Sequence, residues 1–495
     1  MKKLTIRVGN ITSKIIEYIG PETQTALKKA LSYVISGSQF STYAQLGWDG
    51  TKNLFNTRNN TFPTGLLRKA REVLYSLGYE VILEDTRVKP IGFPILLKNV
   101  KLRDYQEECV KEMCRVGRGL IQVGTSGGKS IILSALLANL GVNSLVIVPT
   151  KELLKQTAKA ISDVLGIKVG IIGDGEKDIG KITVATFQSL TTSKDTKRRK
   201  YDPIRNKWSM VDDKEVTVRP DLKEYLENVE LVLVDESHHI SSSSIQQIYD
   251  ACPNAYYRYG VSATPFHDSD EDVLIEAVTG RLLKKFSASY LITHNWISQP
   301  FIHLIQFKQD RLPTGTTYAK AYEQRVIKNT ERNDLVRRLA EMEADKGNSV
   351  LISVRQINHG EIIYKLLKDK YKDKVVFLNS KVASSKVSEV LQQLFRKEVL
   401  IVIATSLINE GINVPSLDTL IFASCPKSPI VTMQLVGRVL RRTESKNTVN
   451  VYDIQDYGCK YLTSASKERV NIYATEPAFV LREITNIEAF LSQQK

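Results

Sequence analysis

The sequence predicts an α/β protein in which two parallel-sheet domains follow one another, preceded by a small α+β domain. From about residue 101, short uncharged strands alternate with amphipathic helices, a pattern typical of βαβ units whose helices cover both faces of a parallel sheet. The alternation fades over residues 287–315 and then resumes, which indicates two such domains. The expected boundaries are 1–95 for the small domain, 101–290 and 325–460 for the parallel-sheet domains, and 461–495 for a C-terminal helical tail.

The N-terminal region combines both kinds of local periodicity. Apolar residues recur on one helical face over 22–35, and a second helix is expected from Pro63 to Gly78. Alternating apolar and polar residues predict strands at 3–8, 14–18 and 80–84.

The parallel-sheet domains are predicted from short apolar runs without charge. Such runs suit strands that are buried on both faces. The expected strands are 120–123, 144–148, 182–185 and 231–234 in the first domain, and 349–354, 375–378, 400–404 and 419–423 in the second.

A polar insertion interrupts the first domain at 192–222. Its first half is rich in Lys and Arg, and its second half predicts a hairpin with strands at 207–211 and 215–219 and a turn at Asp212-Asp213. A charge run is commonly a solvated loop. A contact to duplex or junction DNA is the alternative interpretation.

Composition limits the class of protein. Of 495 residues, 42% are hydrophobic and 25% charged, which excludes a wholly disordered or fibrous chain. The net charge of +15 favours a polyanionic partner, nucleic acid before an anionic membrane. Five cysteines without CxxC or zinc spacing predict reduced thiols in a cytoplasmic protein. We expect no signal peptide and no membrane span, because polar residues and glycine split the uncharged stretch 130–150.

A glycine-rich loop gives the strongest local signal. VGTSGGKS at 123–130 follows a predicted strand and opens a helix. Glycines let backbone N–H groups surround phosphate oxygens, Lys129 can neutralise the β- and γ-phosphates, and Ser130 offers a hydroxyl to Mg²⁺. Val123 stands where G-x-x-x-x-G-K-[ST] begins with glycine. A flexible turn is the alternative, but the strand–loop–helix context favours phosphate binding.

A pair of acids supports this interpretation. The strand LVLV at 231–234 runs directly into Asp235-Glu236-Ser237-His238. In phosphoryl transfer the first acid would bind Mg²⁺ and the second would position the attacking water. Alone, the two acids could be a solvated turn; together with the phosphate loop they predict a nucleoside triphosphatase.

These segments resemble the motifs of superfamily 2 helicases of the DExH type. GGKS, DESH, SATP at 262–265 and QLVGRVLR at 434–441 are similar to motifs I, II, III and VI, and the intermediate motifs follow in order. The likeness covers residues 101–455 and implies two RecA-like lobes with ATP bound between them. The segments similar to the adenine-recognising element and to motifs Ia, Ib, IV and V are Tyr105-Gln106, PTKEL at 149–153, TFQSL at 186–190, 351–360 and 404–413.

Within that superfamily the chain is most similar to phage UvsW-type branch-migration helicases. The order GWDG at 47–50, Phe62-Pro63 and Gly65-Leu66, the loop TSGGKS at 125–130, and His359-Gly360 carry this resemblance. It implies an ATP-dependent DNA helicase or translocase that acts on forks, Holliday junctions, D-loops and R-loops in recombination, repair and replication. It also implies an N-terminal substrate-recognition domain and, for a phage-encoded chain, the host cytoplasm.

The resemblance assigns roles residue by residue. Catalysis would use Lys129, Asp235, Glu236, Gln434, Arg438 and Arg441, with Arg441 as the arginine finger. ATP would be held by Gln106, Thr125, Ser126, Gly127, Gly128, Lys129, Ser130 and Gly411, and Mg²⁺ by Ser130 and Asp235. Coupling would use His238, Ser262 and Thr264. Nucleic acid would contact Trp48, Thr150, Lys151, Thr186, Gln188, Arg198, Arg199, Arg355 and Thr405.

Some of these assignments have a plainer alternative. Trp48 suits the core of a small domain as well as base stacking, and His238 could be a packed residue rather than a coupling one. Asn413 stands where many relatives carry Asp, which leaves a charged contact to the ribose open.

Other functions remain to be separated from a branched-DNA helicase. An RNA helicase shares the same core, because fold does not fix the substrate. The chain could also be the motor subunit of a nuclease complex, or a nucleic-acid-binding protein with a decayed motor, although the intact motifs oppose decay. The expected partners are branched or forked DNA and recombination or replication proteins. We expect a monomer and no membrane partner.

Overall fold

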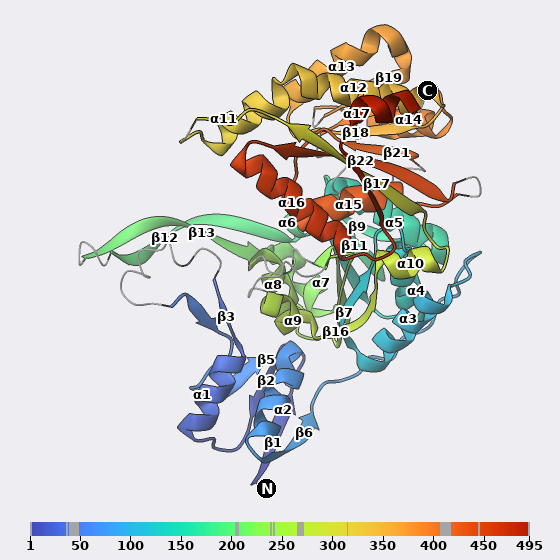
Figure 1. Ribbon diagram of the computed structural model, residues 1–495. Coiled ribbons are helices and arrows are strands. Elements are labelled where there is room, and N and C mark those ends of the chain that lie inside the picture. Colours follow the sequence, from blue (N-terminus) through green and yellow to red (C-terminus); the bar gives the residue numbers. More distant parts are fainter. Residues whose placement is uncertain are drawn as a thin grey trace. The chain divides into compact units, whose positions relative to one another are not determined.

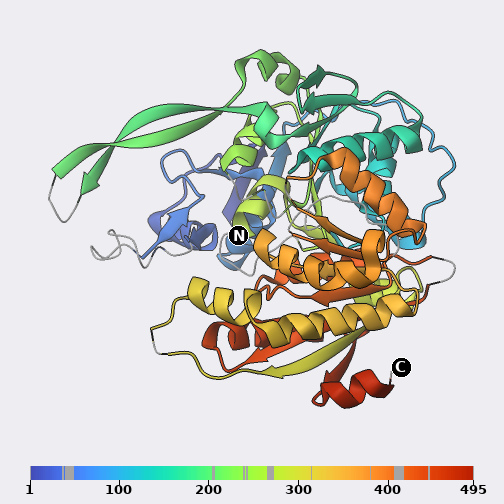
Figure 2. The same ribbon diagram turned by 90° about the horizontal axis from the view of Figure 1, so that it is seen from above.

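The structure is a computed structural model that describes residues 2–35, 38, 49–202, 207–237, 240, 243–264, 272–313, 315–379, 381–405, 417–443 and 446–493, the side chains of 197–202, 207–214, 243 and 384 excepted. Two compact units are present (Figures 1 and 2). Unit 1 comprises Met1–Val123 and Lys129–Lys285, and unit 2 comprises Gly124–Gly128 and Phe286–Lys495. Among the described residues, no helix is both long and apolar enough to cross a membrane.

Unit 1 begins with a small four-stranded sheet. Its strand order is β5 (Thr61–Pro63), β2 (Thr12–Ile15), β1 (Lys2–Val8) and β6 (Tyr79–Asp85). β1 runs parallel to β6 and antiparallel to β2. Buried apolar side chains of the sheet and of two helices form one core. These helices and the remaining short elements are α1 (Pro21–Ala30), η3 (Thr64–Leu66), α2 (Leu67–Ser76), β3 (Ser32–Val34) and β4 (Thr51–Asn53).

The helix expected over 22–35 is too long. α1 ends at Ala30, and residues 32–34 form β3, which pairs antiparallel with β4. Tyr33 and Val34 favour strand over helix, and periodicity alone did not separate the two segments.

This small sheet packs against the rest of unit 1 through backbone groups. Asn10 Nδ2 donates to the Pro253 carbonyl at 2.9 Å, and Arg118 Nη2 donates to the Asn10 carbonyl at 3.0 Å. A Cβ atom on Gly65 would lie 2.0 Å from the carbonyl oxygen of Glu276. Only glycine permits so close an approach of two backbones.

The main sheet of unit 1 has eight strands. Every residue of its β8, β11 and β14 is buried, as expected for strands with helices on both faces. Its order is β10 (Glu176–Asp178), β9 (Gly170–Gly173), β11 (Ile182–Thr186), β8 (Ser144–Val148), β14 (Leu231–Asp235), β15 (Tyr257–Ser262), β7 (Arg118–Val123) and β16 (Leu282–Phe286). The accompanying helices are α3 (Asp104–Val116), α4 (Lys129–Leu140), α5 (Lys151–Leu165), α6 (Phe187–Leu190), η4 (Pro220–Leu222), α7 (Lys223–Glu227), α8 (Ser243–Asp250) and α9 (Asp272–Thr279).

The basic insertion is a long hairpin, and the predicted turn was wrong. β12 (Thr191–Asp202) pairs antiparallel with β13 (Lys207–Val218), and both views show the ribbon extending beyond the main sheet of unit 1 (Figures 1 and 2). Asp212 and Asp213 lie within β13, in register with Lys197 and Thr196. The two acids therefore lie inside a strand rather than at its end.

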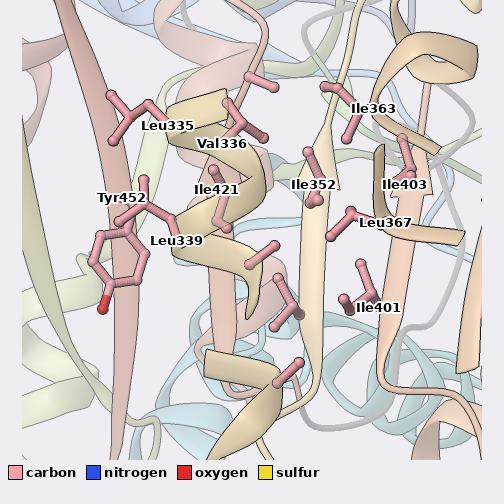
Figure 3. Packing of buried hydrophobic residues seen from close by; sticks show 14 of the residues in the cluster. Leu335, Val336, Leu339, Ile352, Ile363, Leu367, Ile401, Ile403, Ile421 and Tyr452 are labelled. Carbon is pink, nitrogen blue, oxygen red and sulfur yellow. The ribbon is translucent and has the colours of Figure 1, made fainter. Parts of the chain in front are cut away.

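Unit 2 contains a seven-stranded sheet in which every neighbouring pair is parallel. Figure 3 shows side chains of α12 and α13 packed against its central strands. The strand order is β19 (Val375–Leu378), β20 (Ile401–Ala404), β18 (Val350–Ser353), β21 (Thr419–Phe422), β22 (Thr448–Tyr457), β17 (Gln299–Lys308) and β23 (Val480–Ile484). The helices are α10 (Ala288–Thr293), α11 (Tyr318–Tyr322), η6 (Glu323–Ile327), α12 (Thr330–Asp345), α13 (Ile357–Tyr371), η7 (Lys372–Lys374), α14 (Ser384–Phe395), α15 (Pro429–Val439), α16 (Lys460–Ala474) and α17 (Ile487–Gln493).

Three strands of this sheet, β17, β22 and β23, were not predicted, and two of them lie outside the expected bounds of the second domain. β17 falls within the region where the α/β pattern fades, yet it pairs with β22 over its whole length. β23 falls within the expected helical tail and pairs with β17. β23 is the edge strand and β17 is next to it. Both strands are partly exposed and combine polar with apolar residues, so they lack the uncharged runs on which the prediction depended.

Candidate active site and nucleic-acid face

The predicted catalytic segments of unit 1 follow three neighbouring strands. β14 pairs parallel with β15, and β15 pairs parallel with β7. β7 ends at Val123 before the glycine-rich loop, β14 ends at Asp235, and β15 ends at Ser262. Since the carboxyl ends of parallel strands share one edge, the motifs meet where open α/β sheets bind ligands.

The glycine-rich loop has the backbone of a phosphate cradle. Ser126 and Gly128 adopt positive φ angles of 66° and 80°, and Gly127 N donates to the Gly124 carbonyl at 3.0 Å. Alternating backbone conformations of this kind turn N–H groups toward one concavity. α4 begins at Lys129, so its N-terminal dipole also favours an anion here. Ser130 is exposed in the first turn of α4.

A chain of polar contacts joins three predicted motifs. Lys129 Nζ contacts Glu236 Oε1 at 2.9 Å, and Ser262 Oγ donates to Glu236 Oε2 at 3.0 Å. The Thr264 backbone N–H donates to Ser262 Oγ at 3.2 Å. Glu236 has a left-handed φ of 56°, a conformation that L-residues adopt at a cost and that concentrates at functional sites. The acid of motif II therefore contacts both the phosphate-loop lysine and motif III.

Asp235 lies beside this chain at the buried end of β14. Its Oδ1 accepts a hydrogen bond from the Glu236 backbone N–H at 3.0 Å. Burial, together with the negative charge of Glu236, raises the pKa of Asp235 to about 6, against the opposing effect of Lys129. A divalent cation would offset this desolvation, and carboxylate and hydroxyl oxygens are the ligands that Mg²⁺ prefers. Asp235 and Ser130 therefore fit the predicted metal.

The Gln106 side chain forms hydrogen bonds at the start of α3. Its Oε1 accepts from the Arg103 backbone N–H at 3.0 Å, and its Nε2 lies 3.4 Å from the Tyr105 hydroxyl. The side chain is buried, with 1% of its surface exposed. The amide thus caps a helix, a role that the sequence did not predict.

The other half of the same sheet edge presents the predicted nucleic-acid motifs. Thr150 caps α5 by accepting from Leu153 N, and Gln188 Nε2 donates to the Pro149 carbonyl at 3.3 Å. Thr186 Oγ1 lies 2.7 Å from Ser189 Oγ. Motifs Ia and Ib are therefore joined where β8 and β11 end.

Two lysines and an acid lie beside these motifs. Lys151 Nζ contacts Asp174 Oδ1 at 3.1 Å, and Lys155 Nζ contacts Asp174 Oδ2 at 2.6 Å. Hydrogen bonds from Lys155 and Lys151 lower the pKa of Asp174. Sequence reasoning missed Lys155 and Asp174; their signals were a lysine one helical turn after Lys151 and an Asp-Gly pair after a strand.

Unit 2 holds the remaining described candidates. Gln434 is buried and Arg438 half-buried on α15, while Arg441 follows that helix and is exposed. Within this unit, Ser126 Oγ of the phosphate loop donates to the Gly437 carbonyl of α15 at 2.8 Å. Arg355 follows β18, and Thr405 follows β20.

Several predicted residues cannot be placed. Trp48, His238 and Gly411 lie outside the described residues, as do Pro265 and Asn413. Arg198 and Arg199 belong to β12, but their side chains are not described.

A glycine-rich loop after β7, two adjacent acids at the end of β14 and a second parallel sheet are the features of a nucleoside triphosphatase with tandem α/β domains. Comparison with known proteins agrees. Residues 99–267 match the family described as type III restriction enzyme, res subunit, and residues 331–443 match the helicase conserved C-terminal domain.

Individual relatives point to the same class. The chain is 25% identical over 456 residues to the ATP-dependent DNA helicase uvsW of Enterobacteria phage T4, covering 87% of this chain and 86% of that protein. It is 25% identical over 419 residues to the DNA 3'-5' translocase XPB2 of Sulfurisphaera tokodaii, covering 77% and 88%. The fold matches Dbp5 of S. cerevisiae with a TM-score of 0.53 at 13% identity, covering 80% of this chain and 94% of that one. The two matched helicase domains and these relatives support a superfamily 2 helicase that uses ATP.

Proposed function

We propose that this helicase unwinds and branch-migrates DNA forks, Holliday junctions, D-loops and R-loops during recombination, repair and replication. The observation that carries the proposal is the similarity to a phage ATP-dependent DNA helicase over 87% of the chain, which extends beyond the helicase segments at 99–443. The small N-terminal sheet, which lies outside the matched helicase segments, is our candidate for substrate recognition. The chain would act as a monomer in the cytoplasm, together with recombination or replication proteins.

The contacts of Glu236 suggest how ATP binding prepares hydrolysis. The Lys129 ammonium pairs with Glu236. Bound ATP would bring phosphates that take over Lys129, and Mg²⁺, held by Ser130 and Asp235, would neutralise phosphate charge. Glu236 would then be free to accept a proton from, or orient, the attacking water. Thr125, Ser126, Gly127 and Gly128 would supply phosphate-loop donors, and Gln106 and Gly411 would contribute to the nucleotide site.

Residues of unit 2 would complete this site. Gln434 and Arg438 project from α15, and Arg441 follows it. We propose that Arg441 stabilises charge on the transferring phosphate, with Arg438 and Gln434 organising the γ-phosphate. The resemblance to superfamily 2 helicases implies ATP bound between two lobes, so hydrolysis would require the lobes to close. That requirement would couple ATP turnover to movement along DNA.

Motif III would relay the nucleotide state. Ser262 contacts Glu236 directly, and Thr264 contacts Ser262. If Glu236 changed its partner, its hydrogen bond to the Ser262 hydroxyl would change too, and Ser262 is the last residue of β15. His238 is proposed to serve the same relay.

The strand ends beside the catalytic edge would hold the DNA backbone. Thr150, Lys151, Thr186 and Gln188 lie on unit 1, and Arg355 and Thr405 on unit 2. Such groups position a strand without reading its sequence. Arg198 and Arg199 of the hairpin and Trp48 of the N-terminal region are proposed as further contacts to duplex arms.

A strand-exchange assay on four-way junctions tests the proposal. With ATP and Mg²⁺, the chain should convert a junction with homologous arms into two duplexes, and Lys129→Ala should not. A linear duplex of the same length should be unwound more slowly. Equal activity on both substrates, or none on the junction, would refute the branched-DNA proposal. Unwinding only of matched RNA duplexes would favour an RNA helicase, and activity only with an added nuclease subunit would favour a motor subunit.

A further inference from the structure

Three side chains outside the catalytic motifs gather at the carboxyl edge of the unit 2 sheet. Arg355 follows β18, Tyr461 lies in the first turn of α16 after β22, and Tyr318 begins α11 after β17. These strands belong to one fully parallel sheet. The three residues are therefore on the edge that also carries Thr405 after β20.

The three groups form one contiguous cluster. The rings of Tyr318 and Tyr461 meet edge to face, with centroids 5.8 Å apart and an interplanar angle of 86°. Arg355 Nη1 donates to the Tyr318 hydroxyl at 2.6 Å, and its guanidinium lies 5.6 Å from the Tyr318 ring centroid. We call these three residues the aromatic platform.

The aromatic platform is exposed above a solid base. Tyr318 and Tyr461 retain 37% and 42% of their surface. Beneath them, Tyr322 and Leu462 are buried in a cluster that joins α11 to the start of α16. The guanidinium of Arg355 also lies 5.7 Å from the buried Tyr322 ring. The rings are thus held from below while part of each remains open to solvent.

We infer that the aromatic platform stacks a nucleobase of single-stranded nucleic acid, with Arg355 contacting the adjoining phosphate. This inference deepens the proposed function and depends on it. Aromatic faces beside basic side chains bind single strands without sequence preference, because every base offers a π-face. Arg355 commits one N–H donor to Tyr318, and arginine carries five. The same residue can therefore hold the ring and still meet a phosphate.

Stacking would give unit 2 a grip on bases in addition to phosphates. The candidate contacts of motifs Ia, Ib, IV and V are hydroxyl, amide and basic groups suited to phosphate oxygens. A base held against Tyr318 and Tyr461 would have to leave its partner strand. The platform therefore lies where a separated strand, rather than intact duplex, would be favoured.

Affinity for a labelled oligothymidylate, and for the same strand with abasic residues, tests the inference by fluorescence anisotropy. The double variant Tyr318→Ala/Tyr461→Ala should bind the normal strand about tenfold more weakly than wild type, and the abasic strand with unchanged affinity. Tyr318→Phe/Tyr461→Phe, which keeps both rings, should bind the normal strand within about threefold of wild type. Phe395→Ala is the matched control, because Phe395 is an exposed aromatic beside Asp418 and Thr448, at the opposite edge of the sheet.

The outcomes separate the two proposals. Equal losses on normal and abasic strands would show that the tyrosines do not stack a base, and unchanged affinity for the normal strand would show that they do not touch it. Either result would overturn the aromatic platform. If the wild-type chain binds neither strand, the proposed helicase action on nucleic acid is itself wrong. A thermal unfolding midpoint equal to wild type confirms that the alanine variant folds, and the single variant Tyr461→Ala replaces it if it does not.

Discussion

Glu236 shows how a single residue connects binding to chemistry in this helicase. Its carboxylate contacts Lys129 through one oxygen and Ser262 through the other. Its left-handed backbone, with φ 56°, turns the side chain toward both partners at the end of β14. The carboxylate therefore neutralises the phosphate-loop lysine, and we propose that the phosphates of ATP would replace it.

Replacing Glu236 with Gln tests this role. The amide keeps the size of the side chain but cannot act as a base, so ATP turnover should fall at least about a hundredfold. ATP affinity should stay equal or increase, because Lys129 loses its competing partner. Single-turnover hydrolysis and equilibrium nucleotide binding measure the two effects separately. Glu227→Gln, in an exposed ion pair with Lys223, is the control; a Glu236→Gln variant with near-normal turnover would contradict the assignment.

His359 allows a prediction about pH. It is fully buried, with Nε2 2.9 Å from Asn333 Oδ1, and burial together with Arg332 lowers its pKa to about 3. Unfolding returns the ring to its ordinary pKa of about 6.5, so the unfolded state binds the extra proton. Stability should therefore fall as pH drops below about 6.5, by about 2 kcal/mol at pH 5. Urea unfolding gives the free energy of unfolding at pH 7 and at pH 5. The difference between these two values should be smaller for His359→Gln than for the wild type. An equal difference in both proteins would show that His359 does not cause the pH dependence.

The sequence predicted which residues gather at the site, but not their backbone conformations or hydrogen bonds. Lys129, Asp235, Glu236, Ser262 and Thr264 were named from their motifs, and the structure brings them to one edge. The cap made by Gln106 and the φ of Glu236 depend on backbone geometry, which residue identity does not reveal. Tyr318 and Tyr461 are far apart in the sequence, and only the sheet order brings them together.

The hairpin is the element whose prediction changed most. The sequence indicated a hairpin within the basic insertion, but the paired strands are longer and include the two acids at which the turn was expected. Lys194 is in register with Glu215 and Asp195 with Lys214, so opposite charges align along the ribbon. A pattern of charges across two strands cannot be seen while one strand is considered alone.

Shortening the hairpin tests its proposed contact with duplex arms. Ser193 and Val216 are paired in register, so replacing residues 194–215 with Asn-Gly would preserve the base of the ribbon and close it with a two-residue turn. Affinity for a four-way junction should fall, and fall less for single strands, because the removed segment is basic and projects from unit 1. Gel-shift titrations at fixed salt measure both. Unchanged affinity for the junction would show that the hairpin does not contact the duplex arms.

Within unit 1, the N-terminal region is attached to α9 and to the residue before β15. Gly65 approaches the Glu276 and Ala277 carbonyls, and Lys69 Nζ contacts Glu276 Oε2 at 3.0 Å. Arg87 lies over the Tyr256 ring, 4.8 Å from its centroid. A substrate-recognition sheet attached in this way would move together with the ATP-binding sheet of unit 1.

Gly65→Ala should disturb this attachment. The added Cβ would lie 2.0 Å from one carbonyl oxygen and 2.4 Å from another, and overpacking of this kind costs about 1–3 kcal/mol. We expect a lower thermal unfolding midpoint and weaker junction binding. Gly20→Ala is the control, because nothing lies within 4 Å of its Cβ. Equal unfolding midpoints and equal junction affinities for the two variants would show that the close approach at Gly65 contributes to neither stability nor binding.

Over the whole chain, the tandem parallel sheets could be predicted because their central strands are apolar runs without charge. β17 and β23 could not, since each combines buried with exposed residues. The N-terminal sheet was predicted only as separate elements. Its order β5-β2-β1-β6 depends on pairings between residues far apart in the sequence.

Steady-state ATP hydrolysis is the most direct test of the proposal that this helicase acts on branched DNA. It should be measured without nucleic acid and with a single strand, a linear duplex, a four-way junction and matched RNA, each also with Lys129→Ala. We expect the strongest stimulation by the junction and none in the variant. Stimulation by RNA alone, or equal stimulation by branched and linear DNA, would contradict the proposal.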